Sequence, residues 1–310
     1  MSIHTFYCPD MDAPGQCSPS ATKPHLVRGA LLHAKLPVVI HRPTPVTDAD
    51  FELAHNAEFV ADILSLRQPN GFGTKSAQVA STLPYTTGAM LSAAYAALFG
   101  STIGYPTAAL CSGFHHAGYD FAGGFCTFNG LMVTAMRLLT VRPGPFTGPT
   151  VERVAIIDAD YHYGNGTDDI IDRCWENLLA ARLGPDAPPT ALPIFHYTFG
   201  AHFTTPRDAS AYLKAMRDLE RKLASFKPDI VLYQAGADAH RDDPLGGVLS
   251  TEEMFERDRI LFSITKKLGI PVAWNLAGGY QEEADGSIPK VIEIHLNTFR
   301  AALAAYGETP

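Results

Sequence analysis

The sequence of 310 residues predicts an α/β fold: one domain with a mostly parallel central sheet and helices on both faces. Short apolar runs alternate along the chain with helical patterns, which is typical of strand–helix–strand units. Several of these runs also end in glycines that carry reactive side chains, as strand ends do in open α/β sheets. Because the reactive residues spread from His115 to Tyr280 and must meet in one site, we expect residues 1–310 to form a single domain.

The apolar runs are short enough for buried strands, and the helical patterns between them are long enough to cover a sheet. The predicted strands, in chain order, are 36–40, 108–111, 154–160, 193–197, 229–235 and 272–276. The predicted covering helices include 210–226, 251–268 and 290–306. No internal repeat or low-complexity run interrupts this alternation.

Residues 156–166, which read Ile-Ile-Asp-Ala-Asp-Tyr-His-Tyr-Gly-Asn-Gly, place potential metal ligands at alternate positions after an apolar run. If 154–160 is a strand, Asp158, Asp160 and His162 share one face. Two carboxylates and an imidazole suit zinc. The alternative is a buried strand whose Asp158 and Asp160 cap amides of the next helix, and this motif alone favours neither interpretation.

A second motif, Phe-His-His-Ala-Gly-Tyr-Asp at residues 114–120, also follows an apolar run. Its adjacent histidines, His115 and His116, suggest proton chemistry, because imidazole titrates near neutral pH. By itself, a His-His pair is more often an ordinary loop feature.

Two further runs end in the same way. One leads to Gly-Ala-Asp at residues 236–238, and the other leads to Ala-Gly-Gly-Tyr at residues 277–280. Sites form at the carboxyl ends of strands in open α/β sheets, so the four endings can converge on one pocket.

These four motifs, in this order, resemble the zinc-dependent histone deacetylase family, which includes the acetylpolyamine amidohydrolases. The resemblance covers most of the chain, from His55 at the start of a predicted early helix at 55–60 to Tyr280. It implies the fold shared by arginases and deacetylases. Four ordered motifs are far more specific than one.

The resemblance implies that Zn²⁺ is held by Asp160, His162 and Asp238, with positions left for water and substrate, as in catalytic zinc sites. It also implies a general base and acid, His116, and an oxyanion donor, Tyr280.

The remaining implied catalytic residues support the two histidines. His115 would tune charge and position beside His116, with Asp158 as its own partner. Asn165 stands where the family has Asp or Asn as the partner of the second histidine, and asparagine would leave His116 less basic than aspartate would.

The substrate-binding residues implied by the resemblance are Gly124 and Phe125, within Gly-Gly-Phe-Cys, on one wall of a narrow acyl-lysine tunnel. Phe203 is the candidate for the opposite wall. The competing interpretation of each phenylalanine is plain core packing.

The chain departs from the family pattern at two places. Tyr163 replaces a second histidine after His162, and strand parity predicts that it points away from the metal. Ile194 aligns with a serine that helps to hold a potassium ion in relatives. Because isoleucine has no side-chain oxygen, K⁺ near Asp158 would depend on backbone carbonyls.

Composition excludes several other functions. The net charge is −8 with no basic run, so we expect no direct binding of nucleic acid, although an acidic balance suits cationic substrates. No apolar stretch reaches membrane-spanning length and no signal pattern is present, so a soluble, cytoplasmic protein is expected. The five scattered cysteines fit reduced thiols, and neither a Gly-x-Ser-x-Gly elbow nor a Walker motif occurs.

Three functions are compatible with these motifs. The leading one is a zinc amidohydrolase acting on acetyl-lysine in proteins or on acetylated small-molecule amines such as polyamines. The second is a binuclear ureohydrolase, which would need more bridging carboxylates and would leave Tyr280 without a role. The third is a non-catalytic acyl-lysine binding module, which has no need of His116 as a proton shuttle. The sequence carries no signal of the oligomeric state.

Overall fold

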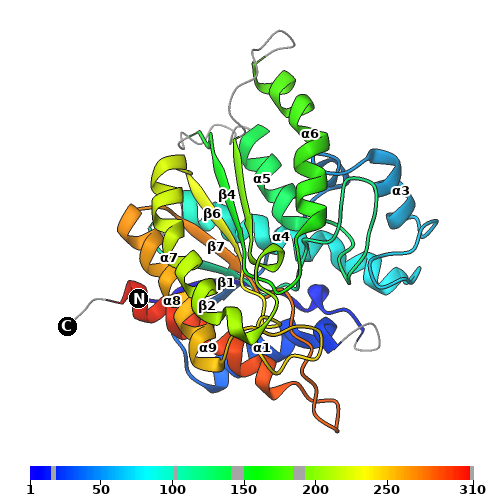
Figure 1. Cartoon of the computed structure of the whole chain (residues 1–310). Coiled ribbons are helices and arrows are strands. Elements are labelled where there is room, and N and C mark those ends of the chain that lie inside the picture. Colours follow the sequence, from blue (N-terminus) through cyan, green and yellow to red (C-terminus); the bar gives the residue numbers. More distant parts are fainter. Residues whose placement is uncertain (15–18, 101–103, 141–149, 184–192, 308–310) are drawn as a thin grey trace.

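The centre of the molecule is a seven-stranded sheet in the order β2-β1-β3-β7-β6-β4-β5, with every neighbouring pair parallel (Figure 1). The computed structural model describes residues 1–14, 19–100, 104–140, 150–183 and 193–307. The strands are β1 (Ile3–Phe6), β2 (Val38–His41), β3 (Thr107–Ala109), β4 (Val154–Asp158), β5 (Ile194–Thr198), β6 (Ile230–Gln234) and β7 (Val272–Asn275).

Helices cover both faces of the sheet, which confirms the predicted single α/β domain (Figure 1). The α-helices are α1 (Lys23–His33), α2 (Asp48–Phe51), α3 (Ala57–Leu64), α4 (Ala77–Phe99), α5 (Gly130–Thr140), α6 (Asn165–Leu183), α7 (Ala209–Phe226), α8 (Thr251–Leu268) and α9 (Pro289–Tyr306), and short 3₁₀ turns lie at η1 (Pro9–Met11), η2 (Pro19–Thr22), η3 (Phe199–Ala201) and η4 (Pro206–Asp208). On one side α8 packs between α7 and α9, and α9 packs on α1; on the other side α4, α5 and α6 pack in sequence.

The central strands are apolar except at their carboxyl ends, where β4 ends in Asp158 and β6 ends in Gln234, because both faces of the sheet are covered. Every residue of β4 and of β6 is buried. Beside them, Trp274 of β7 meets the rings of Phe262 and Phe299 edge to face, with centroids 5.1 Å and 5.0 Å away. This packing holds β7 against α8 and α9.

The predicted strands all occur, with ends displaced by at most a few residues, but β1 (Ile3–Phe6) was not predicted. Its alternating pattern is only four residues long, and its pairing with β2 and β3 is decided by tertiary contacts.

The early helix, α3, begins at Ala57, because the Asn56 side chain caps its first amides. His55 therefore lies before the helix. None of the helices in the described part of the chain is long and apolar enough to span a bilayer.

Four strands that are far apart in the sequence lie side by side in the sheet, namely β3, β7, β6 and β4. Their carboxyl ends lead into the His-His, Gly-Gly-Tyr, Gly-Ala-Asp and Asp-x-Asp-x-His motifs. Because the strands are parallel, all four motifs emerge at the same edge of the sheet.

Candidate active site

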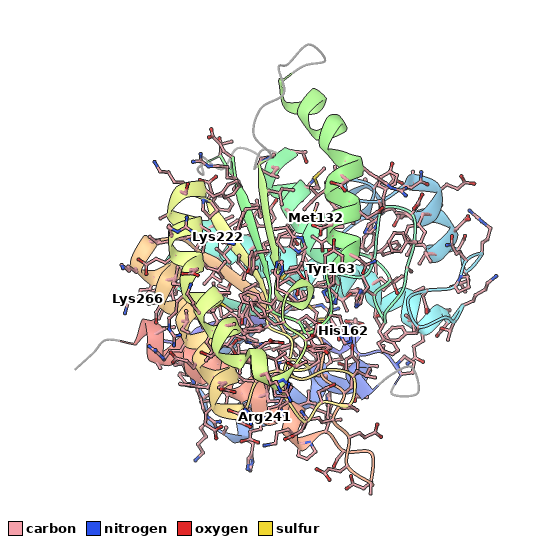
Figure 2. The ribbon with its side chains drawn as sticks, in the orientation of Figure 1. Met132, His162, Tyr163, Lys222, Arg241 and Lys266 are labelled. Atoms are coloured by element: carbon pink, nitrogen blue, oxygen red, sulfur yellow. The ribbon has the colours of Figure 1, made fainter. Side chains whose placement is uncertain are left out.

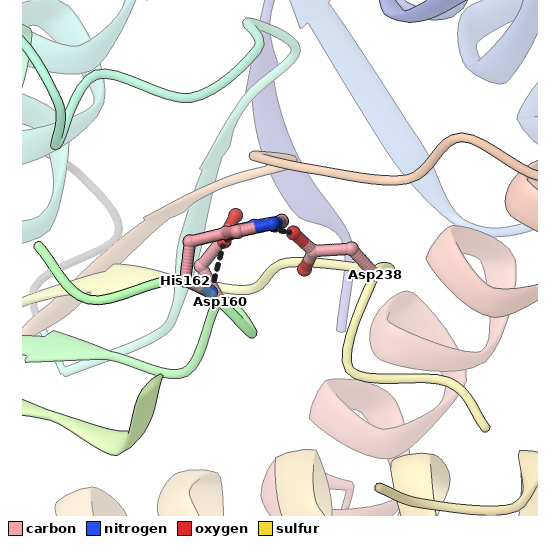
Figure 3. Close-up of side chains that lie close together, drawn as sticks. All are labelled: Asp160, His162 and Asp238. Carbon is pink, nitrogen blue, oxygen red and sulfur yellow. Dashed lines mark hydrogen bonds and ion pairs between the residues drawn. The ribbon is translucent and has the colours of Figure 1, made fainter. Parts of the chain in front are cut away.

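Asp160, His162 and Asp238 bring two carboxylates and an imidazole together at this edge, with one potential ligand atom from each within 4.8 Å of the others. His162 Nδ1 lies 3.0 Å from Asp238 Oδ2 and 3.3 Å from Asp160 Oδ1 (Figure 3). Across the described ranges, no other group of His, Cys, Asp and Glu meets this criterion. Figure 2 shows His162 near the centre of the molecule, with Tyr163 beside it.

Backbone groups hold the two carboxylates at the site. Strand β4 ends at Asp158, so Asp160 lies after the strand rather than on it as predicted, and His162 follows in the same turn. The amide of Gly278 donates to Asp160 Oδ2 at 2.9 Å, and that of Tyr161 donates to Asp238 Oδ1 at 3.0 Å. A Cβ at Gly278 would lie 2.3 Å from Asp238 Oδ2, so only glycine allows this approach.

The electrostatics of this group suit a divalent cation. Burial and the neighbouring Asp160 raise the pKa of Asp238 to about 7. Hydrogen bonds to Asp160 and Asp238 raise the pKa of His162 to about 10. Two buried carboxylates repel each other unless a positive charge lies between them, and oxygen and imidazole nitrogen donors are those that zinc accepts. The donor set therefore fits the expected metal.

His115 lies beside this group and is held by a carboxylate of β4. Its Nδ1 is 2.7 Å from Asp158 Oδ2. Burial disfavours the charged ring, but Asp158 and Asp160 outweigh burial and raise the pKa of His115 to about 9. Gln234, a polar residue in the apolar run of β6, donates to Asp158 Oδ1 at 3.1 Å, and its role was not predicted. A polar residue at the end of a buried strand was the signal that could have indicated it.

His116 is half-buried and faces the ligand group formed by Asp160, His162 and Asp238. Its ring centroid lies 5.8 Å from that of His162. Its Nδ1 lies 2.7 Å from Asn165 Oδ1. Because a carboxamide oxygen only accepts, Nδ1 carries the proton and Nε2 keeps a free lone pair. Burial and the positive charge of His115 lower the pKa of His116 below its ordinary value. The side chain is therefore a neutral base at pH 7.

Replacing Asn165 by aspartate is expected to raise the pKa of His116, because a carboxylate stabilises the imidazolium. The acid limb of kcat/KM should then move to higher pH by roughly 1–3 units, since the base form is lost at higher pH. A pH profile of kcat/KM for both proteins measures this shift. An acid limb at an unchanged pH would show that His116 is not the group whose protonation limits the reaction.

Tyr280 lies beside the site, in the loop that follows β7. Its ring centroid lies 6.4 Å from that of His162, and Asp243 Oδ2 accepts its backbone amide at 2.7 Å. Burial and the carboxylates of Asp160 and Asp238 raise the pKa of Tyr280, so the phenol stays protonated and can donate. The preceding loop is held by the buried Lys23, which donates to the carbonyl of Ala277. Neither Lys23 nor Asp243 was assigned a role from the sequence.

Two of the residues expected to line a tunnel, Gly124 and Phe125, lie beside His116 and Tyr280. Gly124 has a φ of +52°, and a Cβ there would lie 2.3 Å from His116 Cδ2, so glycine lets the loop pass over the histidine ring. Phe125 is 40% exposed, with its ring 5.7 Å from Tyr280. Phe203 is half-buried, and its ring contacts are with Phe199, His202 and Tyr212. Among the described residues, no ring contact joins Phe203 to Phe125.

The expected alignment of Ile194 with a potassium-holding serine is wrong. Ile194 pairs with Val154 at the opposite end of β4, whereas Thr198 pairs with Asp158. Four residues of strand correspond to about 13 Å, so Ile194 is too distant to bear on that position. The side-chain oxygen opposite Asp158 belongs to Thr198, whose Oγ1 accepts a hydrogen bond from the amide of Gly164 at 3.2 Å.

The other departure from the family pattern, Tyr163, points to Asp168 and away from the ligand group. Its hydroxyl lies 2.5 Å from Asp168 Oδ2.

Comparison with known proteins identifies this arrangement. A model of the histone deacetylase domain matches residues 20–180 and 195–297, which is most of the chain. The protein belongs to the histone deacetylase domain family. Its Asp160, His162 and Asp238 are consistent with the metal site of that family.

Individual relatives are distant. The chain is 28% identical to acetylpolyamine amidohydrolase 1 of Pseudomonas aeruginosa over 192 residues, covering 56% of this chain and 50% of that protein. It is 28% identical to histone deacetylase 2 of Arabidopsis thaliana over 187 residues, covering 58% and 46%. The matched segments thus span about half the length of these curated relatives.

The fold is shared over a longer stretch. The crystal structure of acetylpolyamine aminohydrolase from Burkholderia pseudomallei matches with a TM-score of 0.69 at 18% identity, covering 98% of this chain and 99% of that chain. At this identity the likeness concerns the fold alone.

Proposed function

We propose that this protein is a zinc-dependent deacetylase that hydrolyses the acetamide of acetyl-lysine or of an acetylated polyamine. The observation that carries the proposal is the free Nε2 of His116, whose Nδ1–H is held 2.7 Å from Asn165 Oδ1 beside the Asp160, His162 and Asp238 ligand group. Hydrolysis needs an activated water, an oxyanion stabiliser and an acid for the leaving amine, and residues suited to each role line this site.

His116 is the proton carrier in this proposal. Its neutral imidazole takes a proton from the attacking water, whose oxygen bonds to the acyl carbon. The imidazolium then gives the proton to the amine nitrogen as the carbon–nitrogen bond breaks. Acetate and a free amine result. Asn165 keeps the ring in the tautomer that this cycle requires, because its oxygen accepts only from a protonated Nδ1.

Asp160, His162 and Asp238 would hold the zinc ion. When bound, zinc supplies a Lewis acid that polarises the acyl carbonyl and makes water easier to deprotonate. Tyr280 donates its hydroxyl proton to the carbonyl oxygen as negative charge develops there. Asp158 and Gln234 fix the position of His115, which neighbours His116 at a ring-centroid distance of 4.1 Å.

The proposed class of substrate is supported by the position of Phe125 and by the names of the relatives. Phe125 offers an apolar face beside Tyr280, which suits a methylene chain that leads to the acetamide. The relatives are named as acetylpolyamine amidohydrolases and as a histone deacetylase, so both amine classes are candidates.

The two competing functions have weaker support. A binuclear ureohydrolase would need carboxylates that bridge a second metal, but Asp158 is committed to His115 and Gln234. A binding module would have no need of a neutral histidine held in a fixed tautomer next to the ligand group.

The test is kcat/KM for an acetyl-lysine peptide and for an acetylated polyamine, measured on zinc-loaded protein and on protein treated with a chelator. Activity that is lost with the chelator and restored by zinc supports the proposal, and the better substrate identifies the amine class. His116→Ala serves as the control for contaminating hydrolases. Absence of zinc-dependent hydrolysis of either substrate would contradict the proposal.

A further inference from the structure

A buried ion pair lies directly beneath the ligand group, in the first half of α8. Arg257 and Asp258 are 0% and 1% exposed, and Arg257 Nε donates to Asp258 Oδ1 at 2.7 Å. Neither residue belongs to a motif that the sequence singled out. A pair so completely removed from water requires a reason, because taking two charges out of water is strongly unfavourable.

The guanidinium binds the backbone at two strand ends. Arg257 Nη1 donates to the carbonyl of Ala159 at 3.1 Å and to that of Gly236 at 2.7 Å. Ala159 immediately precedes Asp160, at the end of β4, and Gly236 lies two residues before Asp238, at the end of β6. One planar group therefore spans the two neighbouring strand ends that carry all three candidate ligands.

Asp258 holds the guanidinium in place. In addition to Arg257, its carboxylate accepts from the Tyr233 hydroxyl at 2.5 Å and from Thr298 Oγ1 at 2.6 Å. These partners come from β6 and α9, so the pair is fixed from both sides. A further hydroxyl, that of Tyr212 in α7, donates to the carbonyl of Ala159 at 3.2 Å.

The pair adds no net charge next to the ligands, because Asp258 neutralises Arg257. We therefore expect the pair to act on the site by fixing the positions of the strand ends, and not through its electrostatic field. Stability alone does not explain it either, since well-packed apolar residues often replace a buried ion pair without loss of stability.

We propose that Arg257 is a positioning residue, which fixes the separation of the Asp160 and Asp238 strand ends and thereby sets the affinity of the site for its metal. The inference rests on the proposed function only in that the ligand group binds zinc. Groups that orient metal ligands from outside commonly change metal affinity by 10–100-fold when they are removed.

The test replaces both charges together by Arg257→Met with Asp258→Leu, because removing one charge would leave the other buried and unpaired. Zinc affinity is measured by titrating metal-free protein against a competing chelator, and stability is measured by denaturant unfolding of the same metal-free protein. We expect near-unchanged stability with a dissociation constant for zinc about 10–100-fold higher. Arg257→Lys, which keeps the charge but not the planar fork, should recover only part of the affinity.

A matched control is Tyr306→Phe, which removes a buried hydrogen bond 3.0 Å long to Thr265 Oγ1, two turns or about 12 Å further along α8. It should lower stability without changing zinc affinity. If the double variant does not fold, Thr298→Val removes one hydrogen bond to Asp258 and should weaken zinc binding by a smaller factor.

The outcomes separate the two proposals. A folded double variant, or a folded Thr298→Val protein, that binds zinc as tightly as the wild type would overturn the positioning role while leaving the proposed function intact. A wild-type protein that binds no zinc would overturn the proposed function, and the positioning role with it.

Discussion

Changing Tyr280 to phenylalanine is expected to lower kcat for acetamide hydrolysis by about 10²–10³. The phenol is the protonated donor at the end of β7, since burial and the charges of Asp160 and Asp238 raise its pKa. Phenylalanine keeps the ring and its contact with Phe125, at 5.7 Å between centroids, so the packing of the two rings should survive. The measurement is kcat and KM on zinc-loaded protein, together with the zinc content of each sample.

Tyr163→Phe is the matched control for that variant. Tyr163 is 44% exposed and donates to Asp168, away from the ligand group. Its replacement should leave kcat nearly unchanged. Unaltered turnover in Tyr280→Phe, with full zinc content, would remove the oxyanion role of Tyr280, whereas loss of zinc in that variant would point to a structural role instead.

Changing Asp238 to alanine is expected to abolish stoichiometric zinc binding and, with it, hydrolysis. Asp238 is fully buried, and burial together with Asp160 raises the pKa of its carboxyl to about 7. Removing it takes one of the three candidate ligands away from a site in which Asp160 and His162 come from a single turn. Zinc content after dialysis, measured by atomic emission, reports the loss directly.

Asp242→Ala provides the comparison, because it removes a carboxylate only four residues away whose side chain is 71% exposed. This variant should retain zinc and activity. Stoichiometric zinc in purified Asp238→Ala would show that the ligand set is wrong. Loss of zinc in both variants would indicate a general disturbance of the loop after β6.

The expected site residues fall into two groups in the structure. The motif residues lie together because each follows one of four strands that are neighbours in the sheet; they are His115, His116, Asp160, His162, Asp238 and Tyr280. Phe203 follows β5, at the edge of the sheet, and packs on Phe199 and Tyr212. A residue on a loop without a motif has no local pattern that specifies its direction.

The incorrect expectation that Ile194 lies at a potassium site has a similar origin. Ile194 and Thr198 lie on the same short strand, and the sequence contains nothing that says which of them faces Asp158. The register of β4 and β5 makes that choice through the pairing of backbone groups.

Local sequence by itself determined the alternation of strands and helices, the parallel sheet and the ordered motifs at the strand ends, because hydrophobic periodicity and glycine-rich turns are properties of neighbouring residues. Only the tertiary structure decided the strand order and the support of the site by Gln234, Lys23, Asp243 and Arg257. These residues lie between 4 and 137 positions from the nearest candidate ligand. Their role depends on backbone carbonyls, amides and carboxylates that approach them only after the sheet and its covering helices have packed.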